Sequence, residues 1–113
     1  MTIYAIVKWG GEKVNIVDQK FQLELERTTQ CAEMLKVLAH PMRLCIMRGL
    51  IFVGECNVSH MQEHLQIPQS TISQHLAKLR TAGLIEGVRD GVEVHYHVVS
   101  EEAERVVRCL FSR

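Results

Sequence analysis

The stretch Pro68-Gln69-Ser70-Thr71-Ile72-Ser73-Gln74-His75-Leu76-Ala77-Lys78-Leu79-Arg80 combines the spacing of a helix with a polar surface that contains no acidic residue. Its apolar residues recur at steps of four and three and share one helix face; they are Ile72, Leu76 and Leu79. Pro68 suits the first position, because its fixed φ angle and missing N–H cost little there. The opposite face carries short hydrogen-bonding side chains, which is typical of a helix that reads DNA base edges, although an ordinary solvated surface has the same pattern.

A shorter helix is predicted directly before this stretch, over residues 57–65. Asn57 is a good N-cap for it. The residues expected to face inward are Val58, Met61 and Leu65. The linker 66–68 has room only for a turn, so the two segments predict a helix-turn-helix.

A hairpin is predicted after the second of these helices. Gly83 can end the helix. The segments 84–89 and 92–98 are rich in β-forming residues and flank Asp90-Gly91, which is a strong signal for a two-residue turn. A helix-turn-helix followed by such a hairpin is a winged helix. We therefore expect a mainly α fold with a small β-hairpin wing.

The other helical segments carry more apolar surface than one small core needs. Periodicity predicts a first helix over about residues 18–39, a second from Pro41 to about Val53, and a last one that Ser100 caps. The apolar face of the first helix comprises Phe21, Leu25, Thr28, Ala32, Leu35 and Ala39. The second helix is expected to bury Met42, Ile46, Leu50 and Val53. The last helix presents Ala103, Val106, Val107 and Leu110. Part of this surface should meet a partner chain.

The first 17 residues are the least defined part of the chain. Residues 2–9 and 12–17 could form two strands around Gly10-Gly11, but a lone hairpin is marginal in water. A loose arm is the favoured interpretation, with a hairpin as the alternative. The sequence predicts an N-terminal arm over residues 1–17, which is either a hairpin or disordered. It predicts one winged helix-turn-helix domain for DNA binding and dimerisation over residues 18–113.

The composition limits the class of protein. The 113 residues contain 13 basic and 13 acidic side chains, and this balance argues against a strong non-specific polyanion binder but not against a specific one. No membrane span and no secretory signal are expected from the sequence. The four cysteines form no Cys-x-x-Cys pair, which favours a cytoplasmic protein with reduced thiols. No nucleophile elbow, phosphate loop or acid pair is present, so an enzyme is not expected.

Four stretches together resemble the ArsR/SmtB family of winged-helix repressors, over about residues 28–111. They are Ala39-His40-Pro41-Met42-Arg43-Leu44, Pro68-Gln69-Ser70-Thr71-Ile72-Ser73-Gln74-His75-Leu76, Leu79-Arg80-Thr81-Ala82-Gly83-Leu84-Ile85, and the wing that ends in Tyr96. The resemblance implies a homodimer formed by the first and last helices. It also implies binding to double-stranded DNA at a pseudo-palindromic operator, with repression as the outcome.

The resemblance further implies which side chains meet DNA. Base edges would be read by Gln69, Ser70, Ser73 and Gln74. Phosphate or sugar contacts would come from Thr71, His75 and Lys78. Arg89, beside the wing tip, would reach the backbone or the adjacent minor groove.

Many members of the resembled family respond to a metal or an oxidant. At one family metal site the ligand positions hold Asn57 and Ser59, and at another, on the last helix, they hold Ser100 and Glu102. Because these residues do not match the family ligands, no metal or other cofactor is expected. His60 and His64, with Cys56 nearby, supply too few ligands for zinc.

Cysteine chemistry is a further possibility. Some family members use a disulfide between the second and last helices, and Cys45 and Cys109 lie on those elements, offset by several residues from the sensor positions. The alternatives to a plain repressor are therefore a thiol- or metal-responsive repressor of the same fold, and a winged-helix protein-interaction module that does not bind DNA.

Overall fold

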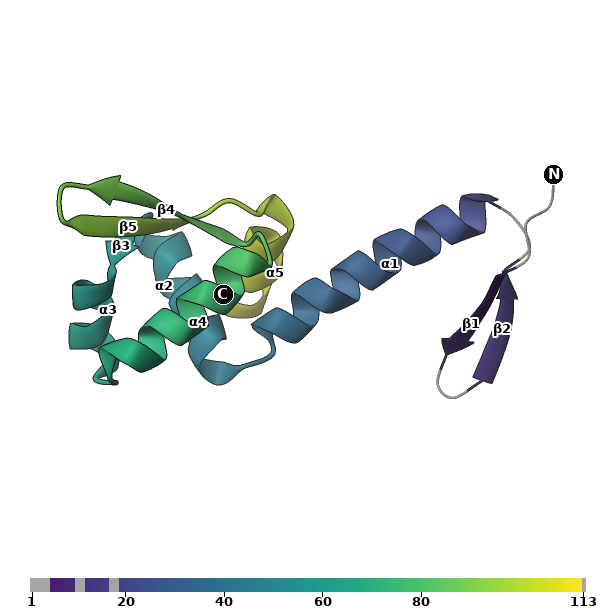
Figure 1. Cartoon of the computed structure of the whole chain (residues 1–113), viewed down its shortest axis with the longest axis horizontal. Coiled ribbons are helices and arrows are strands. Elements are labelled where there is room, and N and C mark those ends of the chain that lie inside the picture. Colours follow the sequence, from purple (N-terminus) through teal and green to yellow (C-terminus); the bar gives the residue numbers. More distant parts are fainter. Residues whose placement is uncertain (1–4, 10–11, 17–18, 113) are drawn as a thin grey trace. The chain divides into compact units, whose positions relative to one another are not determined.

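The computed structural model describes residues 5–9, 12–16 and 19–112 (Figure 1). The chain divides into two compact units, residues 1–33 and 34–113, and the boundary falls within the first helix, α1 (Gln19–Leu38). In the first unit, β1 (Ala5–Trp9) pairs antiparallel with β2 (Glu12–Ile16). These strands correspond to the hairpin alternative for the arm. The Gly10-Gly11 turn lies outside the described residues.

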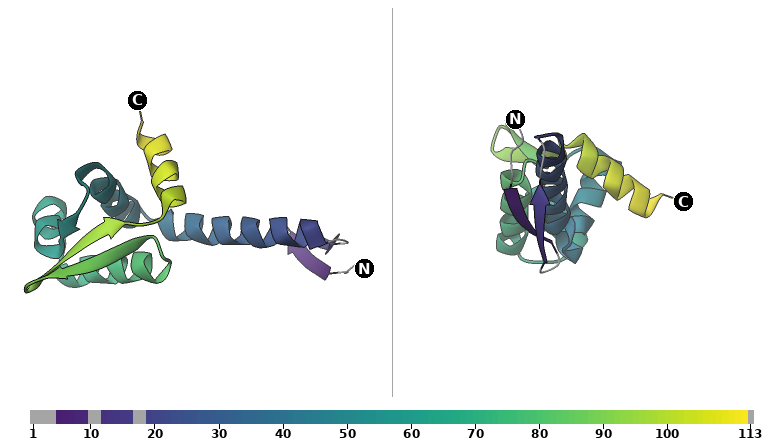
Figure 2. Two further views of the ribbon diagram at one scale, coloured as in Figure 1. Left: turned by 90° about the horizontal axis from the view of Figure 1, so that it is seen from above. Right: turned by 90° about the vertical axis from the view of Figure 1, so that its right-hand side faces the viewer.

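The second unit is a winged helix, as predicted. After the end of α1 its elements are α2 (Pro41–Val53), β3 (Cys56–Asn57), α3 (Val58–Leu65), α4 (Gln69–Thr81), β4 (Ile85–Asp90), β5 (Glu93–Val98) and α5 (Glu101–Phe111). The strands form an antiparallel sheet in the order β3-β5-β4. This sheet packs against α2 and α4, and α5 packs against α2 (Figures 1 and 2). We call the β4–β5 hairpin the wing and α4 the recognition helix.

The core forms where α2, α3, α4, the sheet and α5 meet. The predicted stripe on the recognition helix is confirmed, since Ile72 and Leu79 are fully buried and Leu76 nearly so. Asn57 and Ser100 are the N-caps of α3 and α5, as expected: each side-chain oxygen accepts a backbone N–H, from His60 and Ala103 respectively. Within the part of the chain that the structure describes, no helix is long and apolar enough to cross a membrane.

The prediction for the inward face of α2 is partly wrong. Val53 is 70 % exposed, whereas Ile46, Met47, Leu50 and Ile51 are buried. The reason is that α2 is covered by several elements at once, so its buried arc is wider than one helical stripe, and its last residue projects beyond the core. Cys45, expected on or near this inward face, lies one residue before Ile46, outside the buried arc, and is exposed.

The hairpin turn differs by one residue from the prediction. Asp90 pairs with Glu93, so the two turn residues are Gly91 and Val92 rather than Asp90 and Gly91. Gly91 takes a φ of 66°, which glycine adopts without steric cost. The strand β3 was not expected from the sequence, because two residues are too few to show a period.

Two helices leave apolar surface uncovered in the single chain. In α1, among residues 20–38, only Leu38 is buried, and the side chains of Leu23 and Leu35 are 65 % and 49 % exposed. In α5, Ala103 and Val107 are buried, but Leu110 is 60 % exposed. The apolar faces predicted for these helices are therefore only partly used within one chain.

Candidate nucleic-acid interface

The recognition helix begins without a side-chain cap. Gln66 turns the chain with a left-handed φ of 54°, and Pro68 then occupies the N-cap position. The Pro68 carbonyl oxygen accepts the N–H groups of Thr71 and Ile72, at 3.0 and 3.2 Å. Pro68 makes no side-chain hydrogen bond to the first turn of α4. The positive end of the helix is therefore available to an anion such as a DNA phosphate.

All four predicted base readers lie exposed on this helix. They are Gln69, Ser70, Ser73 and Gln74. Their spacing places Ser70 and Gln74 opposite the buried stripe and Ser73 on its flank, and Gln69 lies in the first turn, three residues before Ile72. Lys78 is also exposed and follows Gln74 one turn later. The structure thus brings together a continuous polar face that carries no carboxylate.

Thr71 and His75 lie on the flank of this face and are half-buried. The ring of His75 lies against that of His40, with the ring centroids 4.6 Å apart and the planes inclined at 52°. The Nδ1 atom of His75 is buried and has no hydrogen-bond partner among the described residues. Burial lowers the pKa of His75, and the nearby His40, Arg43 and Lys78 side chains lower it further. His75 is therefore neutral at pH 7.

The start of α2 supports the recognition helix from the other side. His40 is the N-cap of α2, and its Nδ1 atom accepts the N–H of Met42 at 3.1 Å. Arg43 donates from Nε to the carbonyl oxygen of Val37 at 2.7 Å, which ties α2 to the end of α1. Arg43 was not among the predicted DNA contacts, because helical periodicity does not show which residues of other helices come to lie beside α4.

Arg89 lies on β4, opposite Val94 of β5, and is exposed. It stands one residue pair from the end of the wing, since Asp90 and Glu93 form the last pair. The structure therefore places Arg89 on a separate element from the α4 face, as a winged helix requires.

Gly87, two residues earlier, packs closely: a Cβ atom there would lie 2.8 Å from Val94 Cγ1 and 3.0 Å from Tyr96 Cε1.

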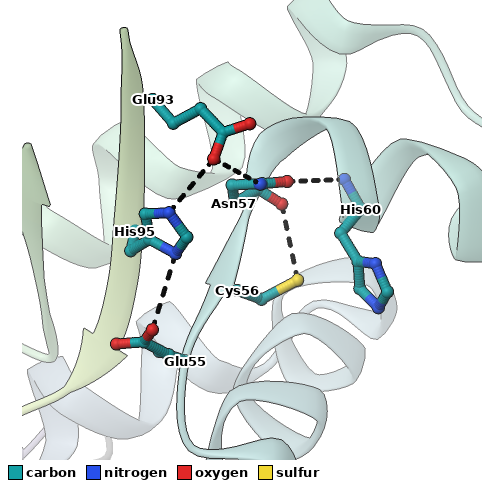
Figure 3. A network of polar contacts seen from close by, with 6 residues as sticks. All are labelled: Glu55, Cys56, Asn57, His60, Glu93 and His95. Atoms are coloured by element: carbon teal, nitrogen blue, oxygen red, sulfur yellow. Dashed lines mark hydrogen bonds and ion pairs between the residues drawn. The ribbon is translucent and has the colours of Figure 1, made fainter. Parts of the chain in front are cut away.

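A polar network joins the wing to the start of α3 (Figure 3). The Glu93 carboxylate accepts a hydrogen bond from Asn57 Nδ2 at 3.2 Å and contacts His95 Nε2 at 3.2 Å. His95 Nδ1 lies 3.6 Å from the Glu55 carboxylate. Because Asn57 also caps α3, one side chain connects the wing to the helix that precedes the recognition helix. The network fixes the wing relative to the helix-turn-helix.

The side chains considered for metal or thiol chemistry are arranged as follows. The Nε2 atoms of His60 and His64 are 3.0 Å apart, so one ring donates to the other. Burial raises the pKa of the Cys56 thiol, which keeps it protonated and makes it a poor metal ligand. Across the described residues, no three His, Cys, Asp or Glu side chains are placed to hold a metal ion. Cys45 and Cys109 are exposed, on α2 and α5, which pack together.

Known proteins share this sequence and fold. The family model described as bacterial regulatory protein, arsR family, matches residues 40–86. The transcriptional repressor PagR of Bacillus anthracis is 39% identical over 79 residues, which are 70% of this chain and 79% of PagR. A biofilm growth-associated repressor of Agrobacterium fabrum is 36% identical over 87 residues, covering 77% of this chain and 74% of the relative.

Solved structures give the same result. The crystal structure of PagR matches with a TM-score of 0.68 at 36% identity, over 81% of this chain and 99% of that one. The transcriptional regulator HlyU from Vibrio vulnificus matches with a TM-score of 0.74 at 31% identity, over 83% of this chain and 97% of that one. The matched region contains the helix-turn-helix, and the matched proteins are described as regulators of transcription.

Proposed function

The chain belongs to the ArsR family of bacterial regulatory proteins, in its PagR-like branch, and we propose that it acts as a homodimer at a pseudo-palindromic operator. It is a DNA-binding transcriptional repressor and not an enzyme. The proposal adds to this the oligomeric state, the residues that meet DNA, and a cytoplasmic location, where the DNA of a bacterium lies.

The observation that carries the proposal is the exposed face of the recognition helix. Gln and Ser side chains can donate to and accept from base edges, and the uncapped helix start favours a phosphate. On this basis Gln69, Ser70, Ser73 and Gln74 read bases. Thr71, His75 and Lys78 contact phosphate or sugar, and Arg89 reaches the backbone or minor groove from the wing. A protein-interaction module would have no need of a face free of carboxylates.

The homodimer is supported by the apolar surface of α1 and α5. Leu23, Leu35 and Leu110 are exposed in the single chain, and exposed apolar surface of this kind marks an interaction site. A two-fold dimer would present two recognition helices to successive major grooves, about 34 Å apart. The expected operator therefore has two half-sites about one helical turn apart.

The direct test is a selection of genome fragments by the purified protein at physiological salt. We expect a short palindrome to be enriched, and footprinting to show two protected major grooves on one face of the duplex. Protection of a single groove would contradict the homodimer. No enriched sequence would contradict the assignment of the α4 residues as base readers and favour the interaction module.

A thiol switch is the second candidate, and it is favoured by the exposure of Cys45 and Cys109 on two helices that pack together. A disulfide would form as two thiols lose two protons and two electrons to an oxidant such as diamide. The selection is therefore repeated with reductant and with diamide. The switch would be supported if the wild-type protein releases DNA only under diamide and if neither Cys45→Ser nor Cys109→Ser shows this release. Release that persists in both variants would exclude this pair.

A further inference from the structure

A basic pocket lies beside the recognition helix, apart from the predicted base readers. Its volume is about 470 Å³. Three cationic side chains line it, each from a different helix: Lys36 of α1, Arg43 of α2 and Lys78 of α4. The remaining lining, which includes Thr81, is uncharged, and no acidic residue lines the pocket within the described part of the chain. The charge of the pocket therefore fits an anion.

Arg43 is held in place by the fold. Its Nε atom donates to the Val37 carbonyl oxygen at 2.7 Å, so the plane of the guanidinium group is fixed by the end of α1. A guanidinium group has five N–H donors in a rigid fork, and this bond uses one of them. The other donors can therefore bind an oxyanion in a geometry that is set before binding.

The pocket continues the polar face of the recognition helix. Ser70, Gln74, Lys78 and Thr81 are spaced by four, four and three residues, so they lie along one stripe of α4. At 1.5 Å per residue, Lys78 is about 12 Å along the axis from Ser70. The major groove is about 12 Å wide, so a helix that places Ser70 in the groove brings Lys78 to the phosphates at its edge.

The electrostatic surroundings of His75 agree with positive charge at this place. His75 precedes Lys78 by three residues on α4, and the Arg43 and Lys78 charges both disfavour its protonated form. Arg43 and Lys78 of the pocket thus act on His75 as positive charges.

We propose that Lys36, Arg43 and Lys78 form a clamp for one phosphate of the DNA backbone, at the edge of the groove that the recognition helix enters. This inference rests on the proposed function and deepens it, since it assigns Lys36 and Arg43 to the interface and makes Lys78 one part of a shared site. Three cations on one phosphate fix the position of the helix along the duplex, because phosphate contacts set register while base contacts select sequence.

The test uses the full chain and compares Lys36→Gln, Lys78→Gln and the double variant. Fluorescence anisotropy measures affinity over a range of salt, for the duplex recovered by the selection and for a shuffled duplex. Each phosphate contact contributes about −0.9 to the slope of log K against log salt. Affinity for both duplexes falls as salt rises from about 50 to 200 mM. In a variant that has lost one contact, this fall should be smaller than in the wild type by a factor of about three.

The double variant distinguishes a shared phosphate from separate ones. If Lys36 and Lys78 hold the same phosphate, the double variant should lose about one contact in total, a slope change of about 0.9 and not 1.8. The matched control is Arg80→Gln, which removes a positive charge from the same helix about 200° away from Lys78. The control should leave the slope nearly unchanged.

Three results would overturn the clamp. One is an unchanged salt slope in both single variants, and another is a double variant that loses two full contacts. The third concerns inorganic phosphate, whose binding is measured by calorimetry. If both single variants lose this binding but keep the wild-type DNA affinity and salt slope, the pocket takes a free anion and not a DNA phosphate. A wild-type chain that does not distinguish the two duplexes would instead contradict sequence reading, and the slope on the shuffled duplex would still decide the clamp.

Discussion

The imidazole rings of His40 and His75 lie with their centroids 4.6 Å apart, so the residue that caps α2 packs directly against the recognition helix. A second positive charge at this place would meet Arg43 of α2 and Lys78 of α4, which already disfavour protonation of His75. Burial of His75 and these neighbouring charges lower its pKa, so the stability of the fold should depend on pH.

The free energy of unfolding should fall as the solution is acidified below about pH 6.5, the ordinary pKa of histidine. The folded-state pKa of His75 is lowered, so the unfolded chain binds the proton more readily between the two pKa values. The stabilisation is therefore complete above the unfolded-state pKa and is lost as the pH falls through it toward the folded-state pKa. Urea unfolding at fixed protein concentration, between about pH 7.5 and 5.5, measures this dependence.

His75→Gln should have a flatter dependence on pH over the same range, because the perturbed ring is gone. Gln62→Ala, at an exposed position of α3 with no titratable group, is the control and should keep the wild-type dependence, since His75 is still present. Equal slopes in wild type and His75→Gln would contradict the assignment.

Gln74→Ala should change the preferred DNA sequence at one position of each half-site. A lost bidentate contact to a base costs about 1–3 kcal/mol of discrimination at that position. Repeating the selection with the variant measures the change. Gln62→Ala, an exposed glutamine of α3, serves as the control and should leave the preference intact. Uniform weakening on all sequences would show that Gln74 contacts the backbone instead.

Gly87→Ala should destabilise the wing by about 1–3 kcal/mol, because overpacking forces neighbouring side chains to move. The added Cβ atom would lie 2.8 Å from Val94 Cγ1. Gly49→Ala, within α2, is the matched control, since a Cβ atom there meets nothing within 4 Å. That change should stabilise the chain by about 0.5–1 kcal/mol through helix propensity. Thermal or urea unfolding of both variants would reveal the opposite signs.

Arg43→Met should lower the free energy of unfolding by about 1.5–3 kcal/mol, the usual range for a hydrogen bond to a charged group. The variant keeps most of the side-chain volume but leaves the Val37 carbonyl oxygen without its donor. Arg80→Met, on the exposed side of α4, is expected to change stability by less than about 0.5 kcal/mol. Similar losses in the two variants would mean that the bond to Val37 contributes little.

Leu110→Asp should convert the proposed dimer to a monomer and weaken operator binding. Leu110 is 60 % exposed on α5, and a carboxylate buried without a partner in an interface is strongly unfavourable. Light scattering coupled to size exclusion measures the oligomeric state. Val92→Asp, at the fully exposed tip of the wing, should remain a dimer. A dimeric Leu110→Asp would place the interface elsewhere.

The helices could be predicted from the sequence because each has local signals. The recognition helix has a stripe of three apolar residues at helical spacing, and α3 and α5 have side chains that cap them, Asn57 and Ser100. These features depend on residues close together in the chain. The polar face of α4 was predicted for the same reason.

Features that depend on residues far apart in the chain could not be predicted. The exposure of Val53 follows from what covers α2, and β3 exists only because β5 lies beside it. The contact of His40 with His75, and the meeting of Lys36 and Arg43 with Lys78, also require the packed fold. The turn of the wing was misplaced by one residue, because Gly91 can occupy either central position of a tight turn.

The pairing of β3 with β5 has a mechanical consequence. Cys56 and Asn57 support β5 opposite Tyr96 and His95, so only Val94 and Glu93 of that strand extend past the support toward the tip. The wing thus extends only a short way beyond its support, and a short extension resists bending. A force on the tip is passed to the start of α3 rather than absorbed by flexing. If α4 and the wing tip both contact DNA as proposed, the distance between their two contact points is set by the fold and not by the DNA.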